Sequence, residues 1–126
     1  MLKSIKHINK ENRPVHTVFG CGGDRDKTKR PVMGKIADEL STVIYVTSDN
    51  PRTENPSSII DDIVTGIKRS DYHRIEDREE AIKTAIQNSE DNAIVLIAGK
   101  GHETYQEVNG ERSFFSDRET IKKYLN

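Results

Sequence analysis

Apolar residues occur in short runs that alternate with segments in which they recur every three or four positions. The runs are rich in β-branched residues, which is typical of buried strands. The recurring positions, such as Ile36, Ala37 and Leu40, place apolar side chains on one face of a helix. The pattern predicts strands at 15–19, 42–47, 72–75 and 92–98, and helices that begin near Pro31, Pro56, Asp77 and Ser116.

The alternation of strands and helices predicts the fold class. Parallel strands are joined by crossover connections, usually helices, and strands covered on both sides read as continuous apolar runs. We therefore expect an α/β domain with a mostly parallel sheet and helices on both faces. Asn109-Gly110 lies between two strand-like segments, 104–108 and 113–115, and predicts a C-terminal hairpin. We place the domain at 15–126 and expect 1–14 to be a linker or a frayed helix, with the natural chain extending further upstream.

Composition narrows the class of protein. The chain has 126 residues, a formal net charge of -1, 33% hydrophobic residues, 33% charged residues and one cysteine. This length fits one domain with a modest core, and the bunching of the apolar residues argues against disorder. The near-neutral charge removes the electrostatic argument for nucleic-acid binding, and no apolar run is long enough for membrane insertion. A start without a secretory signal and a single cysteine, which cannot form an internal disulfide, fit a cytoplasmic protein.

Three polar loops follow the predicted strands, at 20–30, 48–53 and 99–103. Ligands of open parallel sheets bind at the carboxyl ends of the strands. If the sheet is parallel, all three loops open onto one edge, and this convergence is the main functional signal in the sequence.

The first loop combines glycines with charged residues just before a helix, an arrangement that suits an anion. It is not a Walker loop, because Asp26 precedes Lys27-Thr28 where that motif needs Gly-Lys-Ser/Thr. A solvated turn is the alternative interpretation. Cys21 is expected to be a small packing residue.

The second loop contains Asp49, Asn50, Pro51 and Arg52. The proline makes the turn rigid, and the other three residues supply an anion, an amide and a guanidinium. Arg52 can bind a carboxylate through two parallel hydrogen bonds, and Asp49 can accept a hydrogen bond from an ammonium group. This set suits a zwitterionic amino acid. The alternative is an Asx-turn with an exposed arginine.

The third loop contains Gly99 and Gly101, which permit close backbone approach to a ligand, and Glu103, which can pair with an ammonium. His102 and Glu103 do not form a metal motif. The histidines at 7, 16 and 73 have no convergent context, and the charged residues of 74–83 are expected to form a solvated helix face.

Together, the sequences from Val18 to Pro31, from Thr47 to Arg52 and from Ala98 to Glu103 resemble the C-terminal domain of the Mur ligases. Phe115 to Glu119 also fits, and the Asp-Asn-Pro-Arg version resembles the members that add diaminopimelate. The resemblance implies a Rossmann-like three-layer domain of an ATP-dependent ligase of peptidoglycan synthesis. That ligase joins meso-diaminopimelate to UDP-MurNAc-L-Ala-D-Glu through an acyl phosphate.

The resemblance also implies roles for individual residues. ATP and Mg²⁺ would be bound mainly by a central domain that this sequence lacks, so we expect the isolated domain to be inactive and to hold no metal or catalytic residue. Two alternatives stay open: the same domain in a ligase for another amino acid such as L-lysine, and a free-standing nucleotide- or anion-binding module. The implied amino-acid site consists of Arg25, Asp49, Asn50, Pro51, Arg52, Gly99 and Glu103, with Asp24 on the ATP side.

Overall fold

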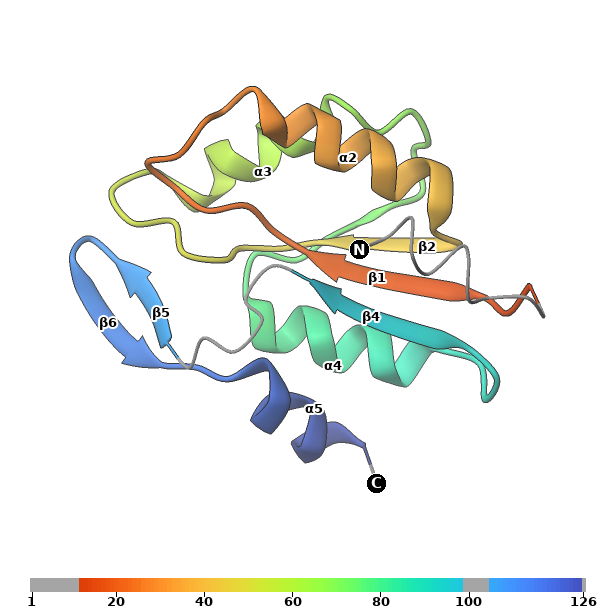
Figure 1. The fold of residues 1–126 in the computed structure, drawn as a ribbon. Helices are drawn as coiled ribbons and strands as arrows, with labels where there is room; N and C mark the ends of the chain where they lie inside the picture. The colour runs from red at the N-terminus through yellow and green to blue at the C-terminus, as the bar shows by residue number, and fades with distance from the viewer. Residues whose placement is uncertain (1–11, 99–104, 126) are drawn as a thin grey trace.

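Four parallel strands form the central sheet of the computed structural model, which describes residues 12–98 and 105–125 (Figure 1). Their spatial order is β3-β2-β1-β4. In register, Phe19 at the end of β1 lies opposite Val46 of β2 on one side and Ala98 of β4 on the other, so three strands end at one edge. The strands are β1 (Val15–Phe19), β2 (Val43–Val46), β3 (His73–Arg74) and β4 (Ile94–Ala98).

Helices cover both faces of this sheet, as Figure 1 shows. Phe19, Ile44 and Val46 pack against one helix pair, whereas Val18 and Tyr45 pack on the opposite face, because successive strand residues point to opposite sides. The predicted three-layer α/β architecture is confirmed. The first face carries α2 (Lys29–Leu40) and α3 (Pro56–Val64), and the second carries α4 (Arg78–Asn88) and α5 (Asp117–Tyr124). In the described part of the chain, no helix has both the length and the apolar character that a bilayer crossing needs.

A separate antiparallel hairpin is formed by β5 (Tyr105–Val108) and β6 (Glu111–Phe114). Asn109 and Gly110 join the strands with φ angles of 51° and 81°, the positive values that a tight two-residue hairpin turn needs. The predicted hairpin is therefore confirmed. Its second strand begins earlier than predicted, because the two-residue turn leads directly into Glu111.

Side-chain caps begin α4 and α5, the two helices for which the sequence predicts them. The Ser116 hydroxyl accepts a hydrogen bond from the Glu119 backbone N–H at the start of α5. Asp77 caps α4 in the same way, but its carboxylate accepts from the N–H of Glu79 rather than from that of Glu80.

One prediction about the charged segment 74–83 is wrong. Glu80 is exposed as expected, but Arg78 is only 1% exposed. As the first residue of α4, Arg78 lies beneath the carboxyl edge of the sheet, where carbonyl groups and the Asp117 carboxylate accept its hydrogen bonds. A buried charge persists because each of these partners compensates its lost hydration.

His16, to which the sequence assigned no role, is also buried in β1. Its Nδ1 lies 2.9 Å from the Tyr45 hydroxyl and its Nε2 lies 2.7 Å from a Glu90 carboxylate oxygen. Both ring nitrogens of His16 therefore have a hydrogen-bond partner inside the fold.

Candidate functional site

The loop that joins β1 to α2 (residues 20–28) meets the loop that joins β2 to α3 (residues 47–55). The Gly23 N–H donates to the Asn50 carbonyl oxygen at 2.7 Å, and the Thr53 hydroxyl donates to the Asp24 carboxylate at 2.7 Å. The predicted convergence is confirmed for these two loops. Gly99 and Glu103 of the third loop lie outside the described residues, although β4, which leads into that loop, ends opposite Phe19.

Gly23 makes the close approach of the two loops possible. A Cβ atom on Gly23 would lie 1.8 Å from the carbonyl oxygen of Pro51, far inside van der Waals contact. Any other residue at this position would push the loops apart, because the obstacle is backbone rather than a flexible side chain.

Arg52 lies at the junction of the two loops and the hairpin. Its Nη1 donates to the Gly23 carbonyl at 3.0 Å, and its Nε lies 3.8 Å from a Glu107 carboxylate oxygen. Its backbone has a left-handed φ of 54° and is fixed on both sides, since its N–H donates to the main-chain carbonyl of Glu107 and its own carbonyl accepts from the N–H of Asn109. The side chain is 18% exposed, so it is neither sealed nor the freely exposed arginine of a simple Asx-turn.

The β2–α3 loop is fixed along its whole turn. Each of the five consecutive carbonyl oxygens from Ser48 to Arg52 accepts a hydrogen bond, and the donors come from four other parts of the fold and from the loop itself. In order along the loop, the donors belong to Arg78, Gln106, Gly23, Glu54 and Asn109. A turn fixed in this way presents its side chains in one geometry and loses little freedom when a ligand binds.

Asp49 and Asn50 are buried, at 9% and 2% exposure. The Asn50 side-chain oxygen accepts from the Glu107 N–H at 2.9 Å, which ties the loop to β5. Pro51 is buried as well and separates this pair from Arg52. The structure therefore gives Asn50 an architectural contact that the sequence did not reveal.

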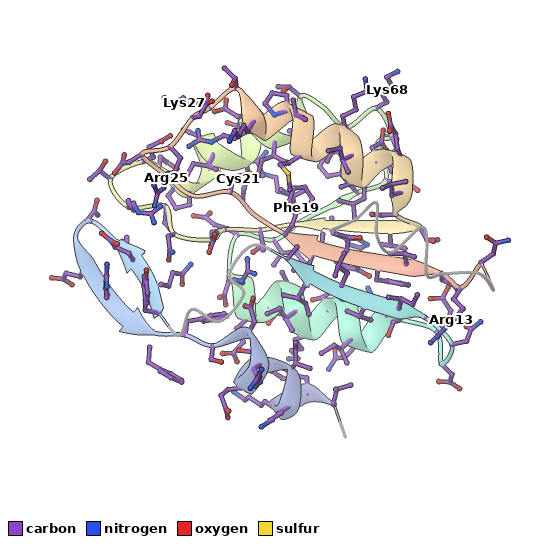
Figure 2. All side chains as sticks on the ribbon, viewed as in Figure 1. Arg13, Phe19, Cys21, Arg25, Lys27 and Lys68 are labelled. Carbon is purple, nitrogen blue, oxygen red and sulfur yellow. The ribbon has the colours of Figure 1, made fainter. Side chains whose placement is uncertain are left out.

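Arg25 projects from the β1–α2 loop, at the end of the molecule that carries the hairpin and opposite the end with Lys68 (Figure 2). It lines a pocket of about 420 Å³ together with Lys29, Asp26 and Asp49. Positively and negatively charged side chains both line this pocket, which lies at the start of α2, and this combination suits a zwitterionic or anionic ligand. Asp24, in contrast, uses its carboxylate to bind Thr53.

Arg30, a buried residue of the pocket wall, pairs with the half-buried Glu54, a contact that the sequence did not reveal. Arg30 is 1% exposed, and its two terminal nitrogens donate to both Glu54 oxygens at 3.0 and 2.9 Å. The guanidinium also reaches Asp62 at 2.9 Å and the Gly22 carbonyl at 3.0 Å. These bonds, with the Asp24 N–H as a further donor, hold the pKa of Glu54 at about 2.

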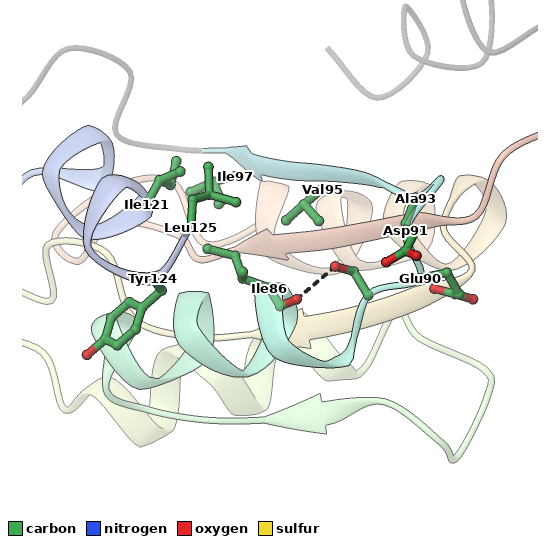
Figure 3. A pocket seen from close by; sticks show the side chains of 10 residues that line it. Ile86, Glu90, Asp91, Ala93, Val95, Ile97, Ile121, Tyr124 and Leu125 are labelled. Carbon is green, nitrogen blue, oxygen red and sulfur yellow. Dashed lines mark hydrogen bonds between the residues drawn. The ribbon is translucent and has the colours of Figure 1, made fainter.

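A second pocket, of about 580 Å³, lies between α4, β4 and α5 (Figure 3). Glu90 and Asp91 lie at one end of it, and Tyr124 and Leu125 lie at the other. Among the described residues that line it there is no basic side chain, so a dicarboxylic ligand would face only like charge. Its chemistry does not fit the amino acid that the loops suggest.

Within 12–98 and 105–125, no group of three or more His, Cys, Asp or Glu side chains could hold a metal ion.

Fold and loops together define a doubly covered parallel α/β domain with a pocket lined by charged residues at its carboxyl edge. A family model described as "Mur ligase, glutamate ligase domain" matches residues 1–101. The chain belongs to the Mur ligase family.

Individual relatives agree with this assignment. The chain is 52% identical to a UDP-N-acetylmuramoyl-L-alanyl-D-glutamate--2,6-diaminopimelate ligase of Fusobacterium nucleatum, over 99% of this chain and 26% of the relative. A ligase of the same name from Chlorobium phaeobacteroides is 48% identical over 99% of this chain and 25% of the relative. A solved structure of such a ligase matches with a TM-score of 0.87 and 45% identity, over 98% of this chain and 25% of that one. The chain thus spans about a quarter of the length of the relatives it matches.

Proposed function

We propose that this chain is the amino-acid-binding domain of a cytoplasmic, ATP-dependent ligase that adds meso-diaminopimelate to UDP-MurNAc-L-Ala-D-Glu in peptidoglycan synthesis. The names of the relatives support the reaction, and the chemistry of the loops supports the amino acid. The observation that carries the proposal is the placement of Arg52. Its guanidinium is held against Gly23 at the junction of two loops, and its side chain remains 18% exposed.

Each end of the amino acid has a proposed partner. Arg52 binds the distal carboxylate through charge-assisted hydrogen bonds, for which a guanidinium is well shaped. Arg25 binds a second carboxylate, and the Glu103 carboxylate with the Gly99 carbonyl receives the distal ammonium. Asp49 adds negative charge at the pocket that Arg25 lines.

The remaining proposed residues shape the site. Asn50 and Pro51 hold the turn that presents Arg52, since both are buried and Asn50 bonds to β5. Asp24 lies on the side from which ATP approaches and fixes the relation of the two loops through Thr53. ATP and Mg²⁺ would be held mainly by the rest of the ligase.

The chemistry that this domain assists is amide formation. The γ-phosphoryl group of ATP passes to the D-glutamate carboxylate, which becomes an acyl phosphate as ADP leaves. The uncharged amine of diaminopimelate then attacks the carbonyl carbon, and inorganic phosphate and a proton leave as the amide forms. The chain's own contribution is to orient the amine and to neutralise the charges of the amino acid in a confined site.

The same contacts would exclude L-lysine, which has no distal carboxylate. With lysine bound, Arg52 would be desolvated without its partner, and leaving such a charge unpaired costs on the order of a few kcal/mol. The proposed specificity thus depends on one guanidinium.

Steady-state kinetics of the complete ligase test the proposal. We expect Arg52→Ala to raise the KM for meso-diaminopimelate by about tenfold or more, because a charge-assisted bidentate contact is lost, and to change the KM for ATP by less than about twofold. Arg112→Ala is a matched control, because Arg112 approaches the same Glu107 carboxylate at 3.6 Å but is 63% exposed.

Equal effects of Arg52→Ala on both substrates would contradict the assigned role. Faster turnover of L-lysine than of meso-diaminopimelate by the wild-type ligase would favour the lysine-adding alternative. Tight binding of ATP by this chain alone, measured by calorimetry, would favour a free-standing nucleotide-binding module.

A further inference from the structure

Arg78 makes four hydrogen bonds from a side chain with no exposed surface. Two bonds, each of 2.8 Å, go to the two carboxylate oxygens of Asp117. The other two go to main-chain carbonyls, that of Ser48 at 3.2 Å and that of Ala98 at 3.1 Å. The charge is therefore neutralised by Asp117, and the remaining donors are directed at the backbone.

The two carbonyls belong to the residues at which two different loops leave the sheet, called the loop roots below. Ser48 is followed directly by Asp49 and the Asn-Pro-Arg turn, and Ala98 is followed directly by Gly99. Their strands, β2 and β4, are not neighbours, since β1 lies between them. One guanidinium thus bridges two loop roots across the central strand.

Ser48 is held from its other side by the segment that precedes α4. The Ser48 N–H and hydroxyl both donate to the Glu76 carbonyl, at 3.3 and 2.8 Å. Arg78, two residues later, binds the Ser48 carbonyl. The start of α4 therefore fixes both the N–H and the C=O of this residue, and with them the direction in which the loop leaves the sheet.

Asp117 connects this arrangement to the last helix. It is the first residue of α5, 7% exposed, and its two oxygens fix the plane of the guanidinium. Removing one member of a buried pair leaves an uncompensated charge, so each residue depends on the other. The orientation of the guanidinium, and hence of both carbonyls, depends on the docking of α5.

We propose that Arg78, oriented by Asp117, is a positioning residue for the amino-acid site: it sets the spacing between Ser48, which leads into the Asp49–Arg52 turn, and Ala98 at the carboxyl end of β4. This inference rests on the proposed function. Arg78 acts through the backbone and does not touch substrate, because its side chain has no exposed surface. Small errors in such spacing are costly, since a misplacement of about 1 Å far from the chemistry can reduce turnover about a hundredfold.

The test compares Arg78→Lys and Asp117→Asn with Arg69→Lys in the complete ligase. Lysine keeps the charge but cannot reach a carboxylate and two carbonyls at once. Arg69 is the matched control, because it also bonds one carboxylate and main-chain carbonyls, but at the opposite edge of the sheet. It bonds Asp38 at 2.7 Å and the Thr42 and Ser41 carbonyls at 2.8 and 2.9 Å.

We expect Arg78→Lys to raise the KM for meso-diaminopimelate by about tenfold while the KM for ATP changes by less than about twofold. Asp117→Asn should shift the same KM in the same direction, because asparagine keeps one acceptor oxygen but leaves the Arg78 charge uncompensated. Arg69→Lys should lower the thermal midpoint without changing either KM. Thermal midpoints of all variants show whether they fold.

The following outcomes would contradict the positioning role of Arg78 or the proposed function. An unchanged KM for meso-diaminopimelate in a folded Arg78→Lys, or a KM change equal to that of Arg69→Lys, would overturn the positioning role. If Arg78→Lys does not fold, Asp117→Asn gives the same comparison. A wild-type ligase that does not add meso-diaminopimelate would instead overturn the proposed function, so the two failures are distinguishable.

Discussion

Cys21 lies half-buried in the wall of the pocket beside the β1–α2 loop. Burial raises the pKa of its thiol to about 11, although the nearby Arg30 charge opposes the shift. Because the thiolate is the nucleophile, we expect iodoacetamide at pH 8 to alkylate Cys21 at least about tenfold more slowly than a free cysteine, whose pKa is about 8.5. The chain has one cysteine, so mass spectrometry reports this site alone.

The same reaction in urea is the control, because unfolding removes the burial and should restore the rate of a free cysteine. In the folded protein, the rate should keep rising with pH up to about 11. Alkylation at pH 8 as fast as in urea would contradict this account of the Cys21 environment.

Residue identity indicates some of the candidate site and not the rest. Arg52 and Asp49 are candidates because the sequence places both charges within one four-residue turn after a strand. Arg78 and Arg30 are not, because their carboxylate partners lie 39 and 24 residues away in the sequence. No local pattern pairs residues at such separations, and buried charges are found only once the fold brings the partners together.

Two helices on one face of the sheet pack through a glycine. A Cβ atom on Gly34 of α2 would lie 2.2 Å from the Ile63 carbonyl oxygen of α3. We expect Gly34→Ala to lower the free energy of unfolding by about 1–3 kcal/mol, because overpacking outweighs the roughly 1 kcal/mol that alanine gains in helix propensity. Urea denaturation measures the change. Lys35→Ala, at an exposed neighbouring position, should change the stability by less than about 0.5 kcal/mol. A Gly34→Ala variant more stable than wild type would contradict this packing.

Elements were more predictable than their contacts. Apolar periodicity and capping residues placed the helices, and Val15–Phe19 was predicted with its observed bounds. The second hairpin strand was predicted too late in the sequence, because Glu111 and Arg112 at its start are polar and give no strand signal. A strand of a solvated hairpin is specified by its partner and its turn rather than by burial.

At the scale of the whole molecule, the sequence predicted a parallel sheet with loops at one edge but not the strand order, in which β1 is flanked by β2 and β4. It also did not predict that the hairpin docks on the β2–α3 loop through the pairing of Arg52 with Val108. Both features depend on tertiary packing between distant segments. The hairpin thereby becomes part of the support of the site, although it lies outside the central sheet.

Acid should weaken the fold through the ion pair of Glu54, in the β2–α3 loop, with Arg30 of α2. The pKa of Glu54 is about 2 in the folded protein, against an ordinary value near 4.5, chiefly because Arg30 donates to its carboxylate. A carboxyl group with a depressed pKa stabilises the fold above its unfolded pKa and loses that contribution as the pH falls through the folded pKa. The advantage of wild type over Glu54→Gln should therefore be constant above about pH 5, shrink between pH 4.5 and 2, and vanish below.

Urea unfolding of the two proteins from pH 7 to pH 2.5 measures this difference. Carboxyl groups outside this network titrate alike in both proteins and cancel when the two free energies of unfolding are subtracted, whereas Asp62, which also pairs with Arg30, belongs to the measured difference. A difference that stays constant down to pH 2.5 would mean that the Arg30–Glu54 pair does not link the loops to the stability of the fold. If the difference shrinks as expected, acid should release the β1–α2 loop from Glu54, because Glu54 also accepts from the Asp24 N–H at 2.7 Å.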